Sequence, residues 1–404
     1  MTVQAISGSP SDVLAAIDLA KATEEDEVLV PPGTWMWNEG VDAFILRFVP
    51  PPQGLTIRGA GIGLTVFEMT IPPTKSVVMI SAEDYLGRGW YDGTPGVSAR
   101  VTGITFKGKV VAEDFGIVGV RMKSLTDFRV DHNEFIDMSG TAIISENYYG
   151  RSHHRGLFDH NTISNPYKDR PDYTGSKNWG YGMVAVGGAS GSGYLRPDID
   201  YYLGKYEGLD DITVFEDNKT FGCRHSTASN QNAWYLARKN EFHDLIPVNY
   251  THVDVHGQAG PTSVGGRGLE CYENLFVGYP SNGNYYTDAI GLRGGGGVVY
   301  NNVYQNLRDG VLLMWYEPGP AAAIPNDIWI WGNTPEKVTV SPGWENLIIE
   351  GENFFVGTPR PGYTPYRYPH RLVSDEPPPP MRARALIQVA LSAATGIALI
   401  LLSL

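Results

Sequence analysis

A stretch of alternating residues, THVDVHG at positions 251–257, carries side chains suited to proton transfer. Two histidines and an aspartate occupy every second position, and valines separate them. Imidazole acts as a general acid or base near neutral pH, and a neighbouring carboxylate can orient it. In a strand that buries its valines, alternation predicts that His252, Asp254 and His256 all point outward on one face.

The same spacing raises the alternative of a metal site. His-x-Asp-x-His offers three ligands that zinc or another divalent ion accepts. Neighbouring residues on one face of a strand diverge, however, so three ligands from a single strand rarely meet at one ion. We therefore predict no metal and no cofactor at this strand. The remaining alternative to a functional site is an ordinary solvated strand face.

Further candidates come from segments that align with this strand. Arg293 is predicted to face outward beside it, and so is His225 or its neighbour Arg224. Arg267 and Glu270 lie in the following turn and strand. Imidazole, carboxylate and guanidinium together suffice for proton abstraction next to a uronate carboxylate, with arginine binding the anion. Hydrolysis would need a second carboxylate within reach, and Glu270 is the candidate.

Aromatic residues crowd the stretch 165–210, which interrupts the regular spacing of the chain. Four of them are candidates for binding a substrate: Trp179, Tyr181, Tyr201 and Tyr202. Exposed aromatic rings suit sugar faces because they combine apolar area with polar tips. The alternative is that these rings pack on one another and hold down long loops.

A repeated sequence motif predicts which structural elements position these residues. It reads apolar, x, apolar, x, x, Asn, x, apolar, and it occurs around Asn133, Asn161, Asn218, Asn240, Asn274 and Asn302, with a weaker copy at Asn353. The steps Asn133 to Asn161 and Asn274 to Asn302 are each 28 residues, and the 57 residues from Asn161 to Asn218 are interpreted as two steps. A period in the twenties, built from short strands, is typical of a solenoid coil.

The repeat predicts how the coils are built. Apolar positions would point inward, and the asparagine would lie at a turn, where it tolerates a left-handed conformation and its amide can bond the next coil. The segments GTAIIS, GMVAVGG, CRHSTA, DAIGLRGG and DGVLLMWY follow their asparagines at comparable places. Together with THVDVHG they are expected to stack about 4.8 Å apart as one parallel sheet.

The chain resembles the right-handed parallel β-helix proteins of the pectate-lyase-like superfamily over residues 25–357. The resemblance rests on EDEVLVPPGTW, on LTIRGAG, and on the recurring phrases DHNEF, DHNTI and ENLF. It implies an all-β fold, a single-stranded right-handed parallel β-helix. It does not select an activity, because this fold carries lyases, hydrolases, phage tailspikes and adhesins.

The predicted organisation has four parts: an N-terminal cap (1–24), the β-helix (25–357), a Pro-rich linker (358–380) and a hydrophobic helix (381–404). The cap is expected to contain a short helix that begins after Ser9 or Ser11, and the β-helix to carry loop insertions around 165–210. Ala385–Leu404 are 20 residues without a charge, and Arg382 and Arg384 precede them. This length spans a bilayer, so a tail anchor is predicted; the alternative is a helix buried in a homo-oligomer or larger assembly.

Composition limits the partners. The formal net charge of −13 argues against nucleic acid, because phosphate binding needs a basic face. Cys223 and Cys271 are too few for a disulfide framework and are expected to be buried thiols. The N-terminus has no secretory signal pattern, so we expect a membrane-anchored or virion-associated protein. The function predicted from the chain is binding of a polysaccharide or cell-surface glycan. Lyase or hydrolase cleavage of an acidic glycan is left open against a non-catalytic adhesin or spike and a purely structural solenoid.

Overall fold

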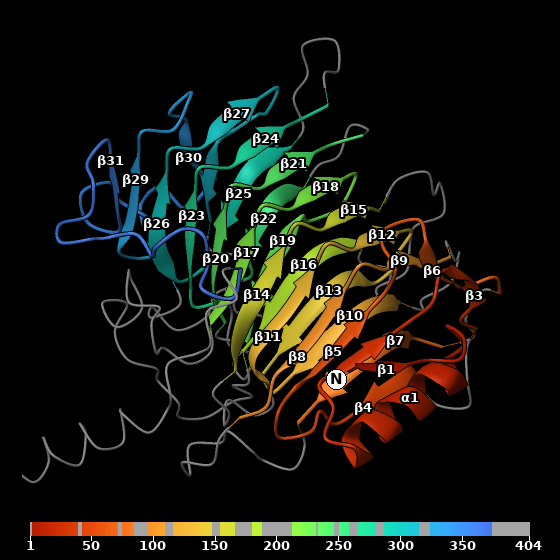
Figure 1. Ribbon diagram of the computed structural model, residues 1–404. Coiled ribbons are helices and arrows are strands. Elements are labelled where there is room, and N and C mark those ends of the chain that lie inside the picture. The colour runs from red at the N-terminus through yellow and green to blue at the C-terminus, as the bar shows by residue number, and fades with distance from the viewer. Residues whose placement is uncertain are drawn as a thin grey trace, which may run out of the picture. The chain divides into compact units, whose positions relative to one another are not determined.

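Three parallel sheets form the body of the protein (Figure 1). The computed structural model describes residues 2–38, 43–71, 75–84, 96–109, 116–147, 154–165, 180–187, 212–231, 233–245, 250–257, 266–279, 287–314 and 324–373. Each strand pairs with the equivalent strand of the coil before and after it, so successive coils stack on one another.

The strands are named here by sheet. Sheet A has 12 strands: β1 (Thr2–Gln4), β2 (Glu27–Leu29), β5 (Leu55–Arg58), β8 (Ala99–Thr102), β11 (Thr126–Asp131), β14 (Arg155–Asp159), β17 (Ile212–Glu216), β20 (Trp234–Arg238), β23 (Gly268–Tyr272), β26 (Gly296–Tyr300), β29 (Ile328–Trp331) and β31 (Phe354–Val356). Sheet B has 9: β3 (Gly33–Met36), β6 (Thr65–Glu68), β9 (Thr105–Lys107), β12 (Glu134–Ile136), β15 (Thr162–Ser164), β18 (Lys219–Phe221), β21 (Glu241–His243), β24 (Leu275–Val277) and β27 (Val303–Gln305). Sheet C has 10: β4 (Phe44–Phe48), β7 (Val77–Glu83), β10 (Ile117–Lys123), β13 (Thr141–Glu146), β16 (Tyr181–Val186), β19 (Thr227–Asn230), β22 (Thr251–Val255), β25 (Asp288–Leu292), β28 (Val311–Leu313) and β30 (Val338–Val340).

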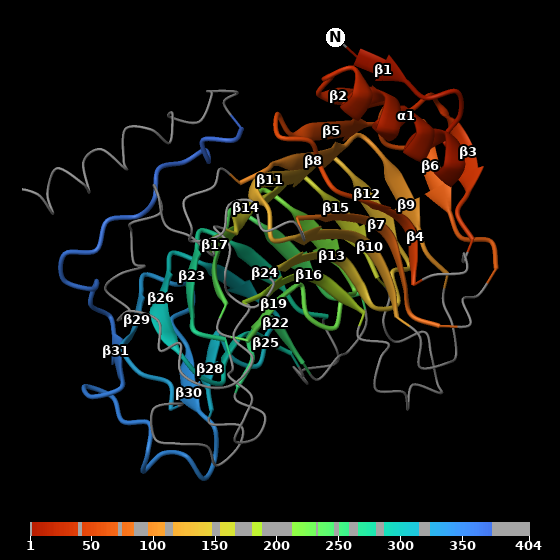
Figure 2. The ribbon, with the colours of Figure 1, turned by 90° about the horizontal axis from the view of Figure 1, so that it is seen from below.

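This arrangement fits a right-handed parallel β-helix, as the sequence predicted. The prediction that six aligned segments share one sheet is also confirmed. They form β13, β16, β19, β22, β25 and β28 of sheet C. Figure 2 shows several of these strands side by side.

The N-terminal helix α1 (Pro10–Ala22) covers the first coils and lies beside β1 and β2 (Figure 2). Its cap is Ser9, whose side chain accepts a hydrogen bond from the backbone N–H of Asp12 at 3.3 Å. Val13 and Ile17 lie one turn apart and are fully buried. The predicted N-terminal helix is therefore confirmed, and Ser9 rather than Ser11 is its cap.

The repeated asparagines form a continuous ladder at the turn between sheets A and B. Each donates its Nδ2 to the Oδ1 of the next, as in Asn133 to Asn161 at 3.3 Å and Asn218 to Asn240 at 3.0 Å. Asn161 bonds Asn218 directly at 3.0 Å, so the 57 residues between them make one coil, and the two-step interpretation is wrong. The last described member is Asn333, to which Asn302 donates at 2.9 Å; Asn353 lies outside the ladder and instead donates to Asn326.

The left-handed residue of each turn comes just before the asparagine. His132, His160, Asp217 and Lys239 have φ values of 53°, 53°, 55° and 56°. The prediction placed this conformation on the asparagine itself. The asparagine side chain is committed to the ladder, so the preceding residue makes the turn and points its own side chain outward.

Aromatic rings fill the interior behind sheet B. Phe106 and Phe135 are stacked with centroids 4.9 Å apart, and Phe242 and Phe276, in β21 and β24, lie 5.0 Å apart. All four are fully buried. Cys223 and Cys271 are free, buried thiols, as predicted.

The chain divides into two units, Met1–Tyr366 and Arg367–Leu404. Residues 358–366 of the predicted linker therefore belong with the β-helix. The predicted hydrophobic helix, 381–404, lies outside the described residues. Within the part of the chain that is described, no helix is both long enough and apolar enough to cross a membrane.

Candidate functional site

The predicted candidates converge on Asp254, at the outer face of sheet C. Val253 and Val255 point into the core and are fully buried, which turns Asp254 outward between them. The register places Ala228 of β19 and Gly291 of β25 directly beside Asp254. These two small neighbours leave space above the sheet, so longer side chains can reach the carboxylate.

Three side chains fill that space. Arg293 binds Asp254 with two hydrogen bonds, Nε to Oδ1 at 2.8 Å and Nη2 to Oδ2 at 2.5 Å. His256 brings its Nδ1 to 3.5 Å from the same Oδ2 and also contacts Arg293 Nη2. His225 places Nε2 at 4.0 Å from Oδ2. The structure therefore brings together His225, Asp254, His256 and Arg293, which are called the Asp254 cluster below.

The cluster holds Asp254 as a carboxylate. Burial opposes its charge, but His225, which becomes charged at low pH, and the charge and hydrogen bonds of Arg293 outweigh burial, so the pKa of Asp254 lies well below its usual range. The buried ion pair thus keeps Arg293 in a fixed orientation at the surface of the sheet.

His225 is held neutral. Burial lowers its pKa to about 4, although the charge of Asp254 and the contact with the Thr251 carbonyl act in the opposite direction. Its Nδ1 lies 2.6 Å from the Thr251 carbonyl oxygen and donates to it. This fixes the Nδ1–H tautomer and leaves the Nε2 lone pair directed toward the Asp254 side.

His256 is the most exposed member of the cluster, with 27% of its side-chain surface accessible against 14% for Arg293. A guanidinium can only donate, so Arg293 Nη2 donates to Nδ1 of His256. The neutral imidazole therefore carries its proton on Nε2, and this N–H is the group available to a ligand.

A second arginine lies between two tyrosine rings beside the cluster. The guanidinium of Arg224 is 4.5 Å from the ring centroid of Tyr250 and 5.7 Å from that of Tyr181. Both rings also meet His225 edge-on, at 5.0 Å for Tyr181 and 5.8 Å for Tyr250. Two arginines and one carboxylate thus share this surface, together with aromatic rings that favour stacking and cation–π contacts.

The prediction that His252 faces outward is wrong. Its ring points into the core, 6.2 Å from the ring of Phe242 and 5.9 Å from that of Phe276, and only 1% of the residue is exposed. His252 and Val253 are both buried, and the pairing with β25 skips His252, so strict alternation fails at the start of the strand. The equivalent positions of neighbouring coils are small, Ser226 in β19's coil and Ala289 in β25.

Glu270 belongs to a different face. It lies in β23 of sheet A, is fully buried, and accepts a hydrogen bond from Tyr363 Oη at 2.7 Å. Arg267 lies in the turn that enters β23, where its backbone N–H donates to the Ala233 carbonyl at 2.9 Å. Asp254 and Glu270 do not form the pair of facing carboxylates that hydrolysis requires.

Of the predicted substrate-binding residues, Tyr181 is at the cluster, as described above. Trp179, Tyr201 and Tyr202 lie outside the described residues.

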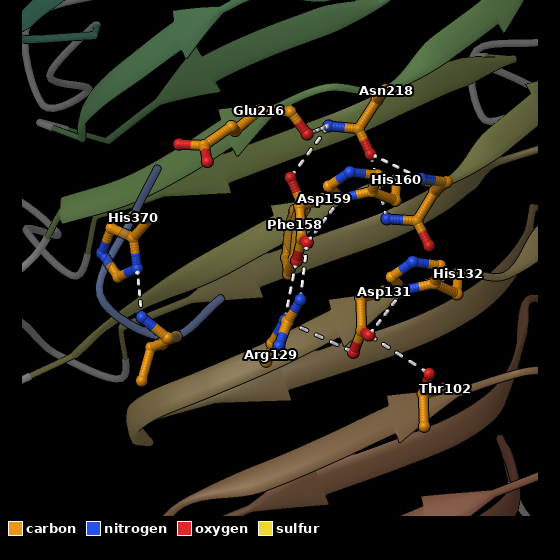
Figure 3. Close-up of polar contacts among 12 residues, drawn as sticks. Thr102, Arg129, Asp131, His132, Phe158, Asp159, His160, Glu216, Asn218 and His370 are labelled. Carbon is orange, nitrogen blue, oxygen red and sulfur yellow. Dashed lines mark hydrogen bonds and ion pairs between the residues drawn. The ribbon is translucent and has the colours of Figure 1, made fainter. Parts of the chain in front are cut away.

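Sequence reasoning missed a second polar surface, the outer face of sheet A (Figure 3). Charged side chains at the ends of successive strands are buried there in ion pairs, such as Arg129 Nη2 to Asp159 Oδ2 at 2.8 Å and Arg238 Nη2 to Glu216 Oε2 at 2.6 Å. The available signal was positional: Asp159, Glu216 and Arg238 each stand two places before a ladder asparagine, and Arg129 stands four places before one.

Lowering the pH from about 7 to about 4.5 is expected to destabilise the fold through His225. Its pKa is 6.5 in the free side chain and about 4 in the folded protein, so the unfolded state binds more protons between these values. Stability is therefore lost as the pH falls through this window, by on the order of 3 kcal/mol for this one group.

Urea unfolding at both pH values checks this expectation against the variant His225→Gln. Glutamine can still donate to the Thr251 carbonyl but does not titrate. The stability advantage of the wild type over the variant should shrink at the lower pH. An advantage that stays constant would contradict the assignment.

No protein-family model matches the chain, and no curated protein matches it either. Among solved structures, it is similar to an alginate lyase from Paenibacillus sp. str. FPU-7, with 13% identity, a TM-score of 0.44 and coverage of 88% of this chain and 99% of that one. It is also similar to the tailspike protein of E. coli bacteriophage HK620 in complex with a pentasaccharide, with 10% identity, a TM-score of 0.46 and coverage of 84% and 61%. The fold assignment rests on the three parallel sheets themselves.

Proposed function

We propose that the outer face of sheet C binds an acidic polysaccharide at the Asp254 cluster and the adjoining Arg224. The observation that carries the proposal is the convergence of Arg293, His256 and His225 around one buried carboxylate on neighbouring coils, with Arg224 held between two tyrosine rings that also contact His225. Because Asp254 orients Arg293 before any ligand arrives, little side-chain entropy is lost on binding.

The chemistry of the surface favours a uronate. Guanidinium groups bind carboxylates through parallel hydrogen bonds, and the Nε2–H of His256 adds a further donor. The rings of Tyr181 and Tyr250 suit the apolar face of a sugar. The formal net charge of −13 repels a polyanion elsewhere on the protein, so binding is expected where the arginines gather.

Cleavage is the second candidate function, and His256 favours it. Elimination next to a uronate carboxylate needs a group that moves a proton and a cation that holds the carboxylate. Arg293 would hold the carboxylate, His225 would accept the ring proton on its Nε2, and His256 would donate its Nε2 proton to the leaving oxygen. An adhesin or a virion spike would use the same face to bind the glycan without cutting it.

Affinity electrophoresis of the full chain tests the proposal. Gels containing polygalacturonate or alginate should retard the protein, added salt should reduce the retardation, and a neutral glucan should have little effect. The variant Arg58→Gln is a matched control, because Arg58 pairs with Glu27 on sheet A, away from the cluster.

Absence of retardation by every uronate polymer, or equal retardation by the neutral glucan, would refute the proposed binding. Incubation of the same polymers with the protein separates the two candidates. Release of unsaturated oligosaccharides assigns a lyase, whereas retardation without release assigns a binding protein.

A further inference from the structure

Two histidines form a stacked pair at the turn between sheets A and B. His132 follows β11 and His160 follows β14, and both have φ of 53°. Equal backbone geometry on adjacent coils holds their rings parallel, with centroids 4.8 Å apart and planes 3° apart. Figure 3 shows both rings beside the strand ends. Their side chains are 56% and 41% exposed, so the pair lies at the surface.

Each ring is bound from behind by a carboxylate. Nδ1 of His132 lies 2.8 Å from Asp131 Oδ2, and Nδ1 of His160 lies 2.8 Å from Asp159 Oδ2. An ionised carboxylate can only accept, so Nδ1 carries the proton in both rings. The Nε2 atoms of both neutral rings therefore present lone pairs, the form in which histidine binds metals.

The two carboxylates are fixed by arginines. Arg100 binds Asp131 through Nε at 2.7 Å and Nη2 at 2.6 Å, and Arg129 binds Asp159 through Nε at 2.9 Å and Nη2 at 2.8 Å. The buried carboxylates thus fix the tautomer of both rings.

We propose that His132 and His160 together bind a divalent transition-metal ion such as Zn²⁺ through their Nε2 atoms, with water as the remaining ligands. Carboxylate, imidazole and metal in this order are the usual arrangement of a histidine ligand. Zinc–nitrogen bonds of about 2.0–2.1 Å at a tetrahedral centre place the two nitrogens about 3.3 Å apart. In the stacked pair the ring planes, and with them the Nε2 lone pairs, are parallel, so binding one ion requires the two half-exposed rings to tilt toward each other.

The neighbouring turn adds a negative field. Asp217 occupies the same turn position one coil further on, so its carboxylate adds negative charge near the pair. A cation at the pair benefits from the same field. Groups of three or more His, Cys, Asp or Glu side chains placed to hold a metal do not occur in the described part of the chain, so the pair would act as a two-ligand site.

Calorimetric titration of the full, untagged chain with ZnCl₂ near neutral pH tests the proposal. One site is expected in the wild type. Either His132→Gln or His160→Gln should weaken binding by about 100-fold or more, because the second imidazole binds intramolecularly once the first is engaged. Affinity should also fall as the pH is lowered, since protons compete for Nε2.

The variant His243→Gln is the matched control and should bind Zn²⁺ as the wild type does. His243 is also a partly exposed histidine beside a carboxylate, with Nε2 3.4 Å from Glu241 Oε2, but it stacks on Phe221 rather than on a second imidazole. Circular dichroism confirms that each variant is folded. No binding by the wild type, or an equal loss in the control, would overturn the proposal without affecting the proposed glycan site on sheet C.

Discussion

Replacing Arg238 with methionine is expected to lower the free energy of unfolding by about 3–5 kcal/mol, because it leaves a buried carboxylate without its partner. Arg238 and Glu216 are both fully buried, and Arg238 binds Glu216 Oε2 through Nε at 2.9 Å and Nη2 at 2.6 Å. Its Nη1 also donates to Tyr272 Oη at 3.1 Å and to the Tyr366 carbonyl at 2.8 Å. The substitution removes all four hydrogen bonds.

Urea unfolding of three variants measures this effect. Lys239→Met is the control, because Lys239 is the next residue and its pair with Glu273 is exposed; it should change stability by less than about 0.5 kcal/mol. The double variant Glu216→Leu/Arg238→Met should recover much of the loss, since it removes both charges. A single-variant loss below about 1 kcal/mol would contradict the buried pair.

Replacing Arg293 with glutamine is expected to weaken binding of a uronate polymer by about 10- to 100-fold, the range for losing a hydrogen bond between charged groups. Glutamine cannot reproduce the bidentate contact with Asp254 or carry the positive charge that faces the ligand. Asp254 then adds an uncompensated negative charge to the site.

Gel retardation at several polymer concentrations gives the affinity. Arg308→Gln is the matched control, because Arg308 forms an equivalent bidentate pair with Asp288, Nε at 2.9 Å and Nη2 at 2.5 Å. Only the Arg293 variant should lose affinity while both remain folded. Equal affinities for the two variants would show that Arg293 does not contact the ligand.

The coil repeat could be predicted from the sequence because it depends on local patterns. Apolar alternation and the recurring asparagine depend on residues within each coil, so the parallel sheet that contains β22 was predicted correctly. The error at Asn161 and Asn218 arose because the 57 residues between them were interpreted as two coils of average length. Their direct hydrogen bond shows that they lie on adjacent coils.

The site could be predicted only in part. The alternation of residues correctly predicted that Asp254 points outward, and the stacking of coils correctly predicted that Arg293 lies beside it. Alternation failed at His252, where the pairing register is interrupted and two successive residues are buried. The burial of Arg238 could not be foreseen, because it depends on Tyr366, which is 128 residues away in the chain.

In the asparagine ladder, the contact between adjacent coils does not depend on how many residues each coil contains. Asn161 and Asn218 make the same contact across 57 residues as Asn218 and Asn240 make across 22, both at 3.0 Å. Chain length can therefore be added or removed between ladder positions while the spine stays in register. Such a scaffold is modular: segments exchanged between homologous coils would diversify the surface that meets a ligand without redesigning the core.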